Sequence, residues 1–300
     1  MTPLCKRRHC CLIGILAAWF SLPLPAAIEL PQADGSTLIV PQTVRSLITL
    51  SPNLTELAFA AGAGEQVIAT VEYSEFPPAA AAIPRIGDAF RIDLERILSL
   101  KPDLVVAWQS GNPQQAVARL RSLGIATWAI EIRRPEEIAA TLEWLGTVTG
   151  NIGPAQRAAK EIRTRLGELS IQYAGQPKVP YFYQVASNPL YTINGEHLIS
   201  RALALCGGVN IFRHENGLAP QVSQEAVIAA DPQALVAPAE PGQEDPLAAW
   251  RDWPRMQAVR NGAMFLLPAD EISRATPRML SAVATACGLL HQTSNMGSHE

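Results

Sequence analysis

One pattern of hydrophobic and polar positions occurs twice along this chain, as DLERILSLKPDLVVAW and, 130 residues later, as VSQEAVIAADPQALVAPA. Each copy predicts a short helix that begins after a capping residue, Asp93 or Ser223, and a buried strand that follows a proline. Glu95 and Glu225 stand two residues after the cap, where the helix dipole favours a carboxylate. The dipole alone would explain one such glutamate, but it explains less well why both copies place one at the same offset.

Strands and helices alternate from Arg45 onward, which predicts parallel sheets covered by helices. The alternation is interrupted by GPAQRAAKEIRTRLGELSIQYAG, in which Ile162, Leu166, Leu169 and Tyr173 recur on one helical face. The prediction is an α/β fold with two mostly parallel-sheet lobes joined by one long rigid helix. The expected segments are an N-terminal lobe at 28–152, a linking helix at 153–176 and a C-terminal lobe at 177–300.

The first residues have the pattern of a secretory signal peptide. Lys6, Arg7 and Arg8 precede a short apolar run, and the small residues Ala26 and Ala27 follow it. We therefore expect this segment to be removed after Ala26 or Ala27, leaving an exported chain. An uncleaved N-terminal anchor is the alternative, although the apolar run is short for a membrane span.

Composition narrows the range of partners. Without residues 1–27 the chain has 27 acidic and 21 basic residues, a net charge near −6, which disfavours nucleic acid. Two cysteines then remain, Cys206 and Cys287. In an exported chain such a pair indicates a disulfide, with two separate buried thiols as the alternative.

No motif in the chain calls for an enzyme, a metal or a bound cofactor. The glycines of GAGEQV fit a helix end better than a dinucleotide site, the histidines lack zinc-ligand spacing, and no serine stands in a nucleophile elbow. Loops at the expected strand ends instead carry aromatic residues and an arginine, where open α/β sheets bind ligands. These residues are Tyr73, Phe90, Trp108, Tyr191 and Arg274. Trp128, Trp144, Trp250 and Trp253 are interpreted as packing residues.

Six segments, in order, resemble one protein family. They are ITLSPNLTELAFAAG, YSEFPP, DLERILSLKPDLVVAWQSGN, LCGGVNIF, PQVSQEAV and SRATPR. Together they are similar to the periplasmic binding proteins that serve ABC importers of cobalamin, siderophores and haem, and the similarity covers about residues 45–290. The cobalamin-binding members of that family fit best.

The resemblance implies a binding protein in which two lobes hold a corrinoid, with no catalysis and no metal of its own. It implies that Tyr73, Trp108, Tyr191 and Arg274 line the ligand pocket, with Pro52 and Asn53 at its floor. Glu95 and Glu225 would dock on arginines of the membrane permease, which works with an ATPase, and Cys206 and Cys287 would form the family's disulfide. The binding protein itself is expected to be a monomer.

Three positions depart from the cobalamin-binding pattern. Ala89 or Phe90 stands where a tryptophan is expected, Ala219 replaces a second tryptophan, and Ser273 replaces an acidic residue. Each aromatic side chain buries about 150–250 Å², so these losses would enlarge the pocket or weaken its hold. Cobalamin remains the expected ligand, with a ferric siderophore or haem as the alternative and a secreted hydrolase using the same cleft as a more distant one.

Overall fold

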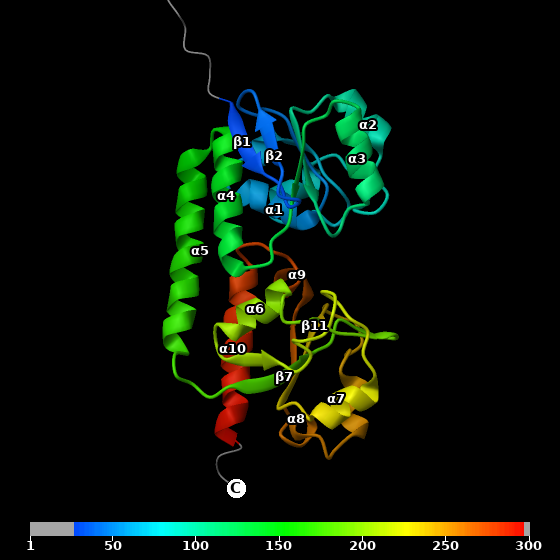
Figure 1. Cartoon of the computed structure of the whole chain (residues 1–300), viewed down its shortest axis with the longest axis vertical. Coiled ribbons are helices and arrows are strands. Elements are labelled where there is room, and N and C mark those ends of the chain that lie inside the picture. The colour runs from blue at the N-terminus through cyan, green and yellow to red at the C-terminus, as the bar shows by residue number, and fades with distance from the viewer. Residues whose placement is uncertain (1–26, 297–300) are drawn as a thin grey trace, which may run out of the picture.

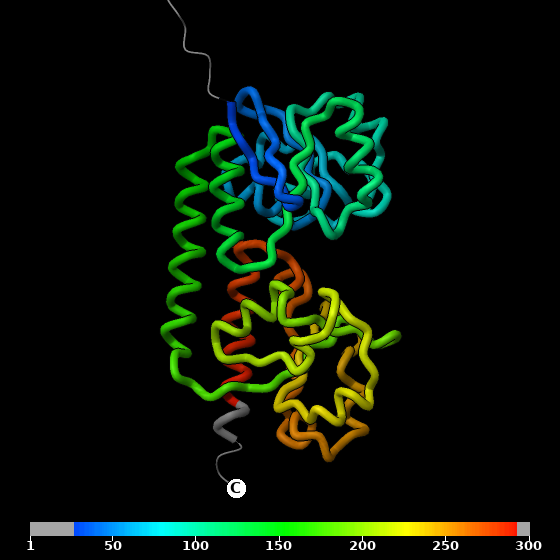
Figure 2. Tube along the Cα trace, viewed as in Figure 1, coloured from blue at the N-terminus to red at the C-terminus, as the bar shows by residue number. Residues whose placement is uncertain are grey.

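The computed structural model of this chain describes residues 27–296. The expected signal peptide, apart from Ala27, lies outside the described residues. Two lobes stand one above the other beside a long helix, α5, and the chain passes from one lobe to the other once, through that helix (Figures 1 and 2). No helix within residues 27–296 combines the length and apolarity needed to cross a bilayer.

The N-terminal lobe contains a four-stranded parallel sheet in the order β4-β3-β5-β6. Its strands are β3 (Leu47–Thr49), β4 (Val67–Ala69), β5 (Leu104–Trp108) and β6 (Thr127–Ile130). Its helices are α1 (Pro52–Ala60), α2 (Leu94–Leu100), α3 (Gln114–Ser122) and α4 (Pro135–Thr149). Side chains alternate between two buried clusters, for example Leu104 and Val106 on one face and Val105 on the other, as expected for a sheet covered on both faces.

The C-terminal lobe repeats this arrangement with a four-stranded parallel sheet in the order β10-β7-β11-β12. Its strands are β7 (Val179–Tyr183), β10 (Gly208–Asn210), β11 (Ala234–Ala239) and β12 (Met264–Pro268). Its helices are α6 (Leu198–Ala204), α7 (Gln224–Ala230), α8 (Gln257–Arg260), α9 (Ala269–Ile272) and α10 (Met279–Met296). In each lobe the first strand lies between the second and the third, and the fourth is at the edge.

Helix α5 (Ile152–Gln172) is the one segment through which the described chain passes between the lobes, and it contacts α4 of one lobe and α10 of the other. It lies close against α4, since a Cβ on Gly146 would come within 2.2 Å of the Cβ of Ala155. The fold of two parallel-sheet lobes joined by a long helix is therefore confirmed. The helix begins one residue before the expected linking segment and ends four residues before its limit.

Two antiparallel hairpins were not expected. β1 (Ile28–Pro31) pairs with β2 (Thr37–Val40), and β8 (Ala186–Ser187) pairs with β9 (Leu190–Tyr191). The first packs on the N-terminal lobe, where the indole N–H of Trp128 donates to the carbonyl of Pro31 (2.7 Å). The packing role predicted for Trp128 fits this burial, but that for Trp253 is wrong, because its side chain is 41% exposed.

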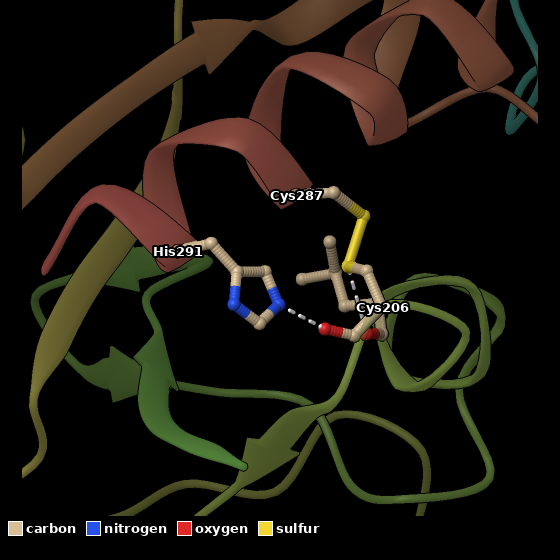
Figure 3. Close-up of a disulfide and its surroundings, with 4 residues drawn as sticks. Cys206, Cys287 and His291 are labelled. Atoms are coloured by element: carbon tan, nitrogen blue, oxygen red, sulfur yellow. Dashed lines mark hydrogen bonds between the residues drawn. A yellow bond between two sulfur atoms is a disulfide. The ribbon is translucent and has the colours of Figure 1, made fainter. Parts of the chain in front are cut away.

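The Sγ atoms of Cys206 and Cys287 lie at disulfide-bonding distance, 2.05 Å, joining the turn after α6 to the middle of α10 (Figure 3). His291, one turn further along α10, bonds through Nε2 to the carbonyl of Cys206 (2.5 Å). Its ring also stacks on Tyr173 at the end of α5. The cysteine pair therefore lies where the linking helix meets the C-terminal lobe.

Candidate ligand-binding site

A cavity of about 480 Å³ is lined by residues of both lobes. Its N-terminal wall comes from the chain that follows β3, β5 and β6, at the carboxyl ends of parallel strands, where α/β sheets bind ligands. Its C-terminal wall comes from the start of α6, from residues 218–219, and from the segment that follows α9. Of the predicted ligand-binding residues it contains Pro52, Asn53, Trp108 and Arg274.

Trp108 is fixed by the turn that follows β5. Its backbone N–H donates to Oδ1 of Asn112 (2.7 Å), and Gly111 leaves space for the indole, since a Cβ there would come within 2.7 Å of the ring. The buried amide of Asn112 donates to the carbonyls of Leu50 (2.8 Å) and Ala89 (2.9 Å). One asparagine thus links the turn after β5 to the segments at Leu50 and Ala89, and the ring of Trp108 is positioned before any ligand arrives.

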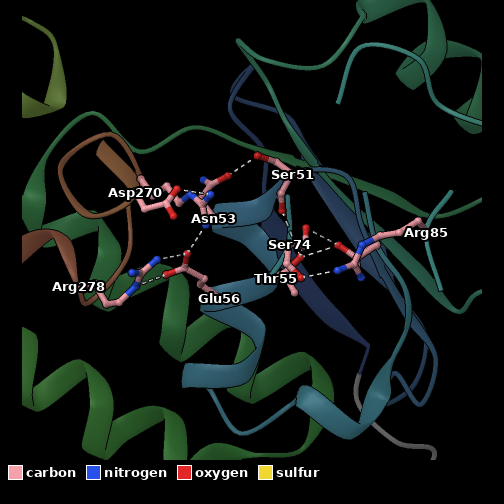
Figure 4. Close-up of polar contacts among 10 residues, drawn as sticks. Ser51, Asn53, Thr55, Glu56, Ser74, Arg85, Asp270 and Arg278 are labelled. Carbon is pink, nitrogen blue, oxygen red and sulfur yellow. Dashed lines mark hydrogen bonds and ion pairs between the residues drawn. The ribbon is translucent and has the colours of Figure 1, made fainter. Parts of the chain in front are cut away.

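Tyr73 lies outside the residues that line this cavity, and its side chain is 71% exposed. Its φ of +64° is the left-handed conformation, which is uncommon for tyrosine and is concentrated at functional sites. The next residue, Ser74, is buried, and its Oγ accepts from the hydroxyls of Thr70 (2.9 Å) and Thr55 (3.3 Å). Arg85 donates to the Ser74 carbonyl (2.9 Å), so an exposed tyrosine stands on a firmly anchored loop (Figure 4).

Phe90 and Tyr191 also lie outside the cavity lining. Phe90 is 75% exposed on a turn in which Oδ1 of Asp88 accepts from the backbone N–H groups of Phe90 (2.8 Å) and Arg91 (2.7 Å). These bonds lower the pKa of the Asp88 carboxyl. Tyr191 is half-buried in β9 and pairs with Ala186. The contact of these two aromatic residues and Tyr73 with a ligand stays a prediction.

Arg274 lines the cavity, but its guanidinium is already engaged by carboxylates. Nη1 donates to Glu56 Oε1 (2.9 Å), and Nη2 pairs with Asp270 (2.5 Å). Glu56, in α1 of the other lobe, also accepts from Arg278 Nε (3.0 Å) and Nη2 (2.7 Å) (Figure 4). The nearly fully buried carboxylate thus joins the lobes beside the cavity and raises the pKa of Arg278.

Glu95 and Glu225 occupy the same position in two matching helices. Each stands at the second residue of its helix and is exposed. The backbone N–H of Arg96 donates to Asp93 (2.9 Å), and that of Ala226 donates to Ser223 (3.2 Å), so both predicted caps are present. Helices α2 and α7 both lie on the side of the molecule away from α5 (Figure 1). Their role in docking stays a prediction.

Sequence reasoning missed several residues of the cavity wall, including Glu131, Arg133 and His197. Glu131 accepts from the backbone N–H and the hydroxyl of Ser110 (3.0 Å each). His197 caps α6, with the N–H of Ile199 donating to its Nδ1 (3.2 Å). The sequence did offer one signal for these wall residues, since Glu131 directly follows a predicted strand and His197 stands at the start of a predicted helix. Ala219 and Ser273, the two C-terminal departures, also line the cavity.

Comparison with known proteins fits this architecture. The sequence profile of the periplasmic binding proteins matches residues 47–271. The chain belongs to the periplasmic binding protein family. It is 39% identical over 259 residues to the vitamin B12-binding protein of Vibrio cholerae serotype O1, covering 85% of this chain and 92% of that protein. Its identity to the vitamin B12-binding protein of Photorhabdus laumondii is 36% over 250 residues, covering 83% and 89%.

Solved structures also resemble this chain. The periplasmic vitamin B12-binding protein BtuF of Vibrio cholerae superposes with a TM-score of 0.78 at 37% identity, covering 85% of this chain and 99% of that one. The periplasmic haem-binding protein RhuT from Roseiflexus sp. RS-1 superposes with a TM-score of 0.70 at 21% identity, covering 83% and 98%. The second similarity concerns the fold alone.

Proposed function

We propose that this chain is a periplasmic substrate-binding protein that captures cobalamin or a related corrinoid between its lobes and delivers it to an ABC importer. The observation that carries the proposal is the cavity between the lobes, walled by Trp108 and Arg274, in a chain so similar to vitamin B12-binding proteins. The mature chain would be a monomer that begins after Ala26 or Ala27. It would comprise the lobes 28–152 and 177–300 and the linking segment 153–176.

The cavity constrains how a corrinoid would sit. A volume of about 480 Å³ is typical of a site for a drug-sized ligand, and a corrinoid is larger than that. The ligand would therefore extend beyond the present lining towards the exposed aromatic rings of Tyr73 and Phe90, or the lobes would move apart to receive it. The small side chains of Ala219 and Ser273 leave space where the family pattern has larger ones.

The proposed activity is capture and transfer, without chemistry on the ligand. Aromatic side chains would pack on the apolar parts of the macrocycle, and polar groups of the wall would fix its orientation. Glu95 and Glu225 would meet basic residues of the permease, because complementary rim charges set the orientation and rate of docking. Cys206 and Cys287 would be oxidised in the periplasm.

Calorimetric titration of the mature chain with cyanocobalamin tests the proposal. We expect saturable binding, a weakening of about tenfold in Trp108→Ala from the lost aromatic contact, and no change in Trp253→Ala, whose exposed ring lies outside the cavity. Quenching of tryptophan fluorescence by the ligand should likewise be weakened in Trp108→Ala and retained in Trp253→Ala. An absence of cobalamin binding up to tens of micromolar, with binding of haem or a ferric siderophore instead, would overturn the ligand assignment.

A further inference from the structure

Two polar side chains of the cavity, one from each lobe, have no part in the function proposed so far. Arg133 stands three residues after β6, in the N-terminal lobe, and His197 directly precedes α6, in the C-terminal lobe. Both line the same cavity, and the charge of Arg133 is close enough to affect the ionisation of His197. A ligand held between the lobes would therefore meet both groups.

His197 lines the cavity and has one ring nitrogen, Nε2, that is not used in capping α6. The N–H of Ile199 donates to Nδ1 (3.2 Å), so in the neutral ring the proton is on Nε2. Burial, and second the positive charge of Arg133, lower the pKa of His197 to about 4, which keeps the ring neutral near pH 7. Because Nε2 carries the proton, the ring offers an N–H group and not a lone pair for a metal such as cobalt.

Arg133 is a cation without a carboxylate partner among the described residues. The neighbouring Arg134 is paired with Glu137 (2.8 Å), whereas Arg133 bonds to that carboxylate only through its backbone N–H (2.7 Å). Glu131, two residues earlier, is oriented by its two bonds to Ser110 and is not within ion-pair distance of Arg133. The guanidinium of Arg133 is therefore available to an anionic group.

We propose that Arg133 and His197 together bind an anionic oxygen of the captured ligand, namely the phosphodiester of the nucleotide loop of a corrinoid. This proposal rests on the proposed function. A guanidinium presents paired N–H groups that match phosphate oxygens, and the Nε2–H of His197 supplies a further donor from the opposite lobe. Since the donors come from both lobes, the contact would also fix the angle at which the lobes hold the ligand.

The experiment compares cyanocobalamin with dicyanocobinamide, a corrinoid that lacks the nucleotide loop and its phosphodiester. Both are titrated calorimetrically into the full mature chain and into three variants. These are Arg133→Gln, the neighbouring control Arg134→Gln, and His197→Asn, in which the amide oxygen can still accept from Ile199. Thermal unfolding of each variant checks that the fold is kept.

We expect Arg133→Gln to weaken cobalamin binding about 10- to 100-fold, the loss typical of one charge-assisted hydrogen-bonded contact. His197→Asn should weaken it less, by about 3- to 10-fold, because a neutral donor is lost. Cobinamide binding should change by less than about threefold in both variants, and Arg134→Gln should leave both ligands unaffected, since Arg134 is not among the lining residues.

Two results would overturn this proposal while leaving the proposed function intact. One is an unchanged cobalamin affinity in Arg133→Gln. The other is an equal loss for both corrinoids, which would place the contact on the macrocycle or its amide side chains. If the wild-type chain binds neither corrinoid, the proposed function itself is wrong, and this contact is wrong with it.

Discussion

The two lobes are built on the same plan, yet they differ in how that plan is held together. Their sheets have the same strand order, and their repeated units have the same sequence of exposed and buried positions from residue 92 to 97 and from 222 to 227. Both short helices end on a left-handed residue, Lys101 or Asp231, before a proline. The similarity of the lobes thus includes the unit that presents a glutamate.

The differences lie in the cavity walls and the supports behind them. In the N-terminal lobe, buried amides and hydroxyls such as Asn112 and Ser74 hold the loops. The C-terminal lobe has comparable bonds from buried Asn210 and Thr192, and in addition Cys206 and Cys287 join α10 to the turn after α6. The start of α6, with His197 directly before it, forms part of the wall. The repeated unit therefore gives both lobes a matching exposed surface, whereas the two cavity walls are built from different residues.

The largest expected effect comes from reversing the two matching glutamates. Glu95→Arg combined with Glu225→Arg should reduce cobalamin uptake to background in the source bacterium, because the reversed charges would repel a basic docking surface. Cobalamin affinity should change less than twofold, since both residues lie outside the cavity.

The matched control is Glu136→Arg combined with Glu168→Arg. It makes the same change in net charge at exposed positions, and Glu136 is also the second residue of a helix. This control should transport normally. Uptake that survives the reversal of Glu95 and Glu225 would mean that the two carboxylates serve only their helices.

The second-largest effect is expected from removing the cysteine pair, and it should be confined to the C-terminal lobe. Cys206→Ala with Cys287→Ala removes a cross-link over 81 residues, which should cost the folded chain about 2–5 kcal/mol. Hydrogen exchange of backbone amides should show faster opening of the C-terminal lobe and little change in β3 to β6. Reduced wild-type chain should behave like the variant, and equal loosening of both lobes would show that they do not unfold separately.

The smallest effect tests whether the repeated helices are energetically equivalent. Asp93→Ala and Ser223→Ala each remove a side chain that accepts from a backbone N–H, and each should lower the free energy of unfolding by about 1 kcal/mol in urea titration. The glycine variants at the same positions should lose only about a few tenths of a kcal/mol. A large cost in one lobe alone would mean that the two units differ in how they depend on their caps.

Local signals made most of the fold predictable. Caps, prolines and buried apolar runs fixed the repeated units, and the spacing of Ile162, Leu166 and Leu169 identified α5, on which all three are buried. The β1–β2 hairpin was missed although Asp34-Gly35 is a typical hairpin turn, with Gly35 at a φ of +83°. Its strands are only four residues long and half-exposed, so hydrophobic alternation gave a weak signal.

The site was less predictable because its geometry depends on residues far apart in the chain. Pro52, Asn53, Trp108 and Arg274 do meet at one cavity. The pairing of Arg274 with Glu56 spans 218 residues and joins different lobes, which no local pattern encodes. A single histidine or arginine likewise gives no signal of its own, since the position of His197 relative to Arg133 is set by how the lobes are placed.

The carboxylate of Glu56 also has a mechanical consequence. This buried anion of the N-terminal lobe forms ion pairs with Arg274 and Arg278 of the C-terminal lobe. The guanidinium of Arg278 also lies 4.0 Å from the ring centre of Phe76. Pulling the lobes apart at this point would expose three charges to water in a single step. Separation of the lobes would break these ion pairs, while hydration of the three freed charges would offset part of the lost attraction, so this buried cluster fixes the relative placement of the lobes more by its geometry than by its net energy.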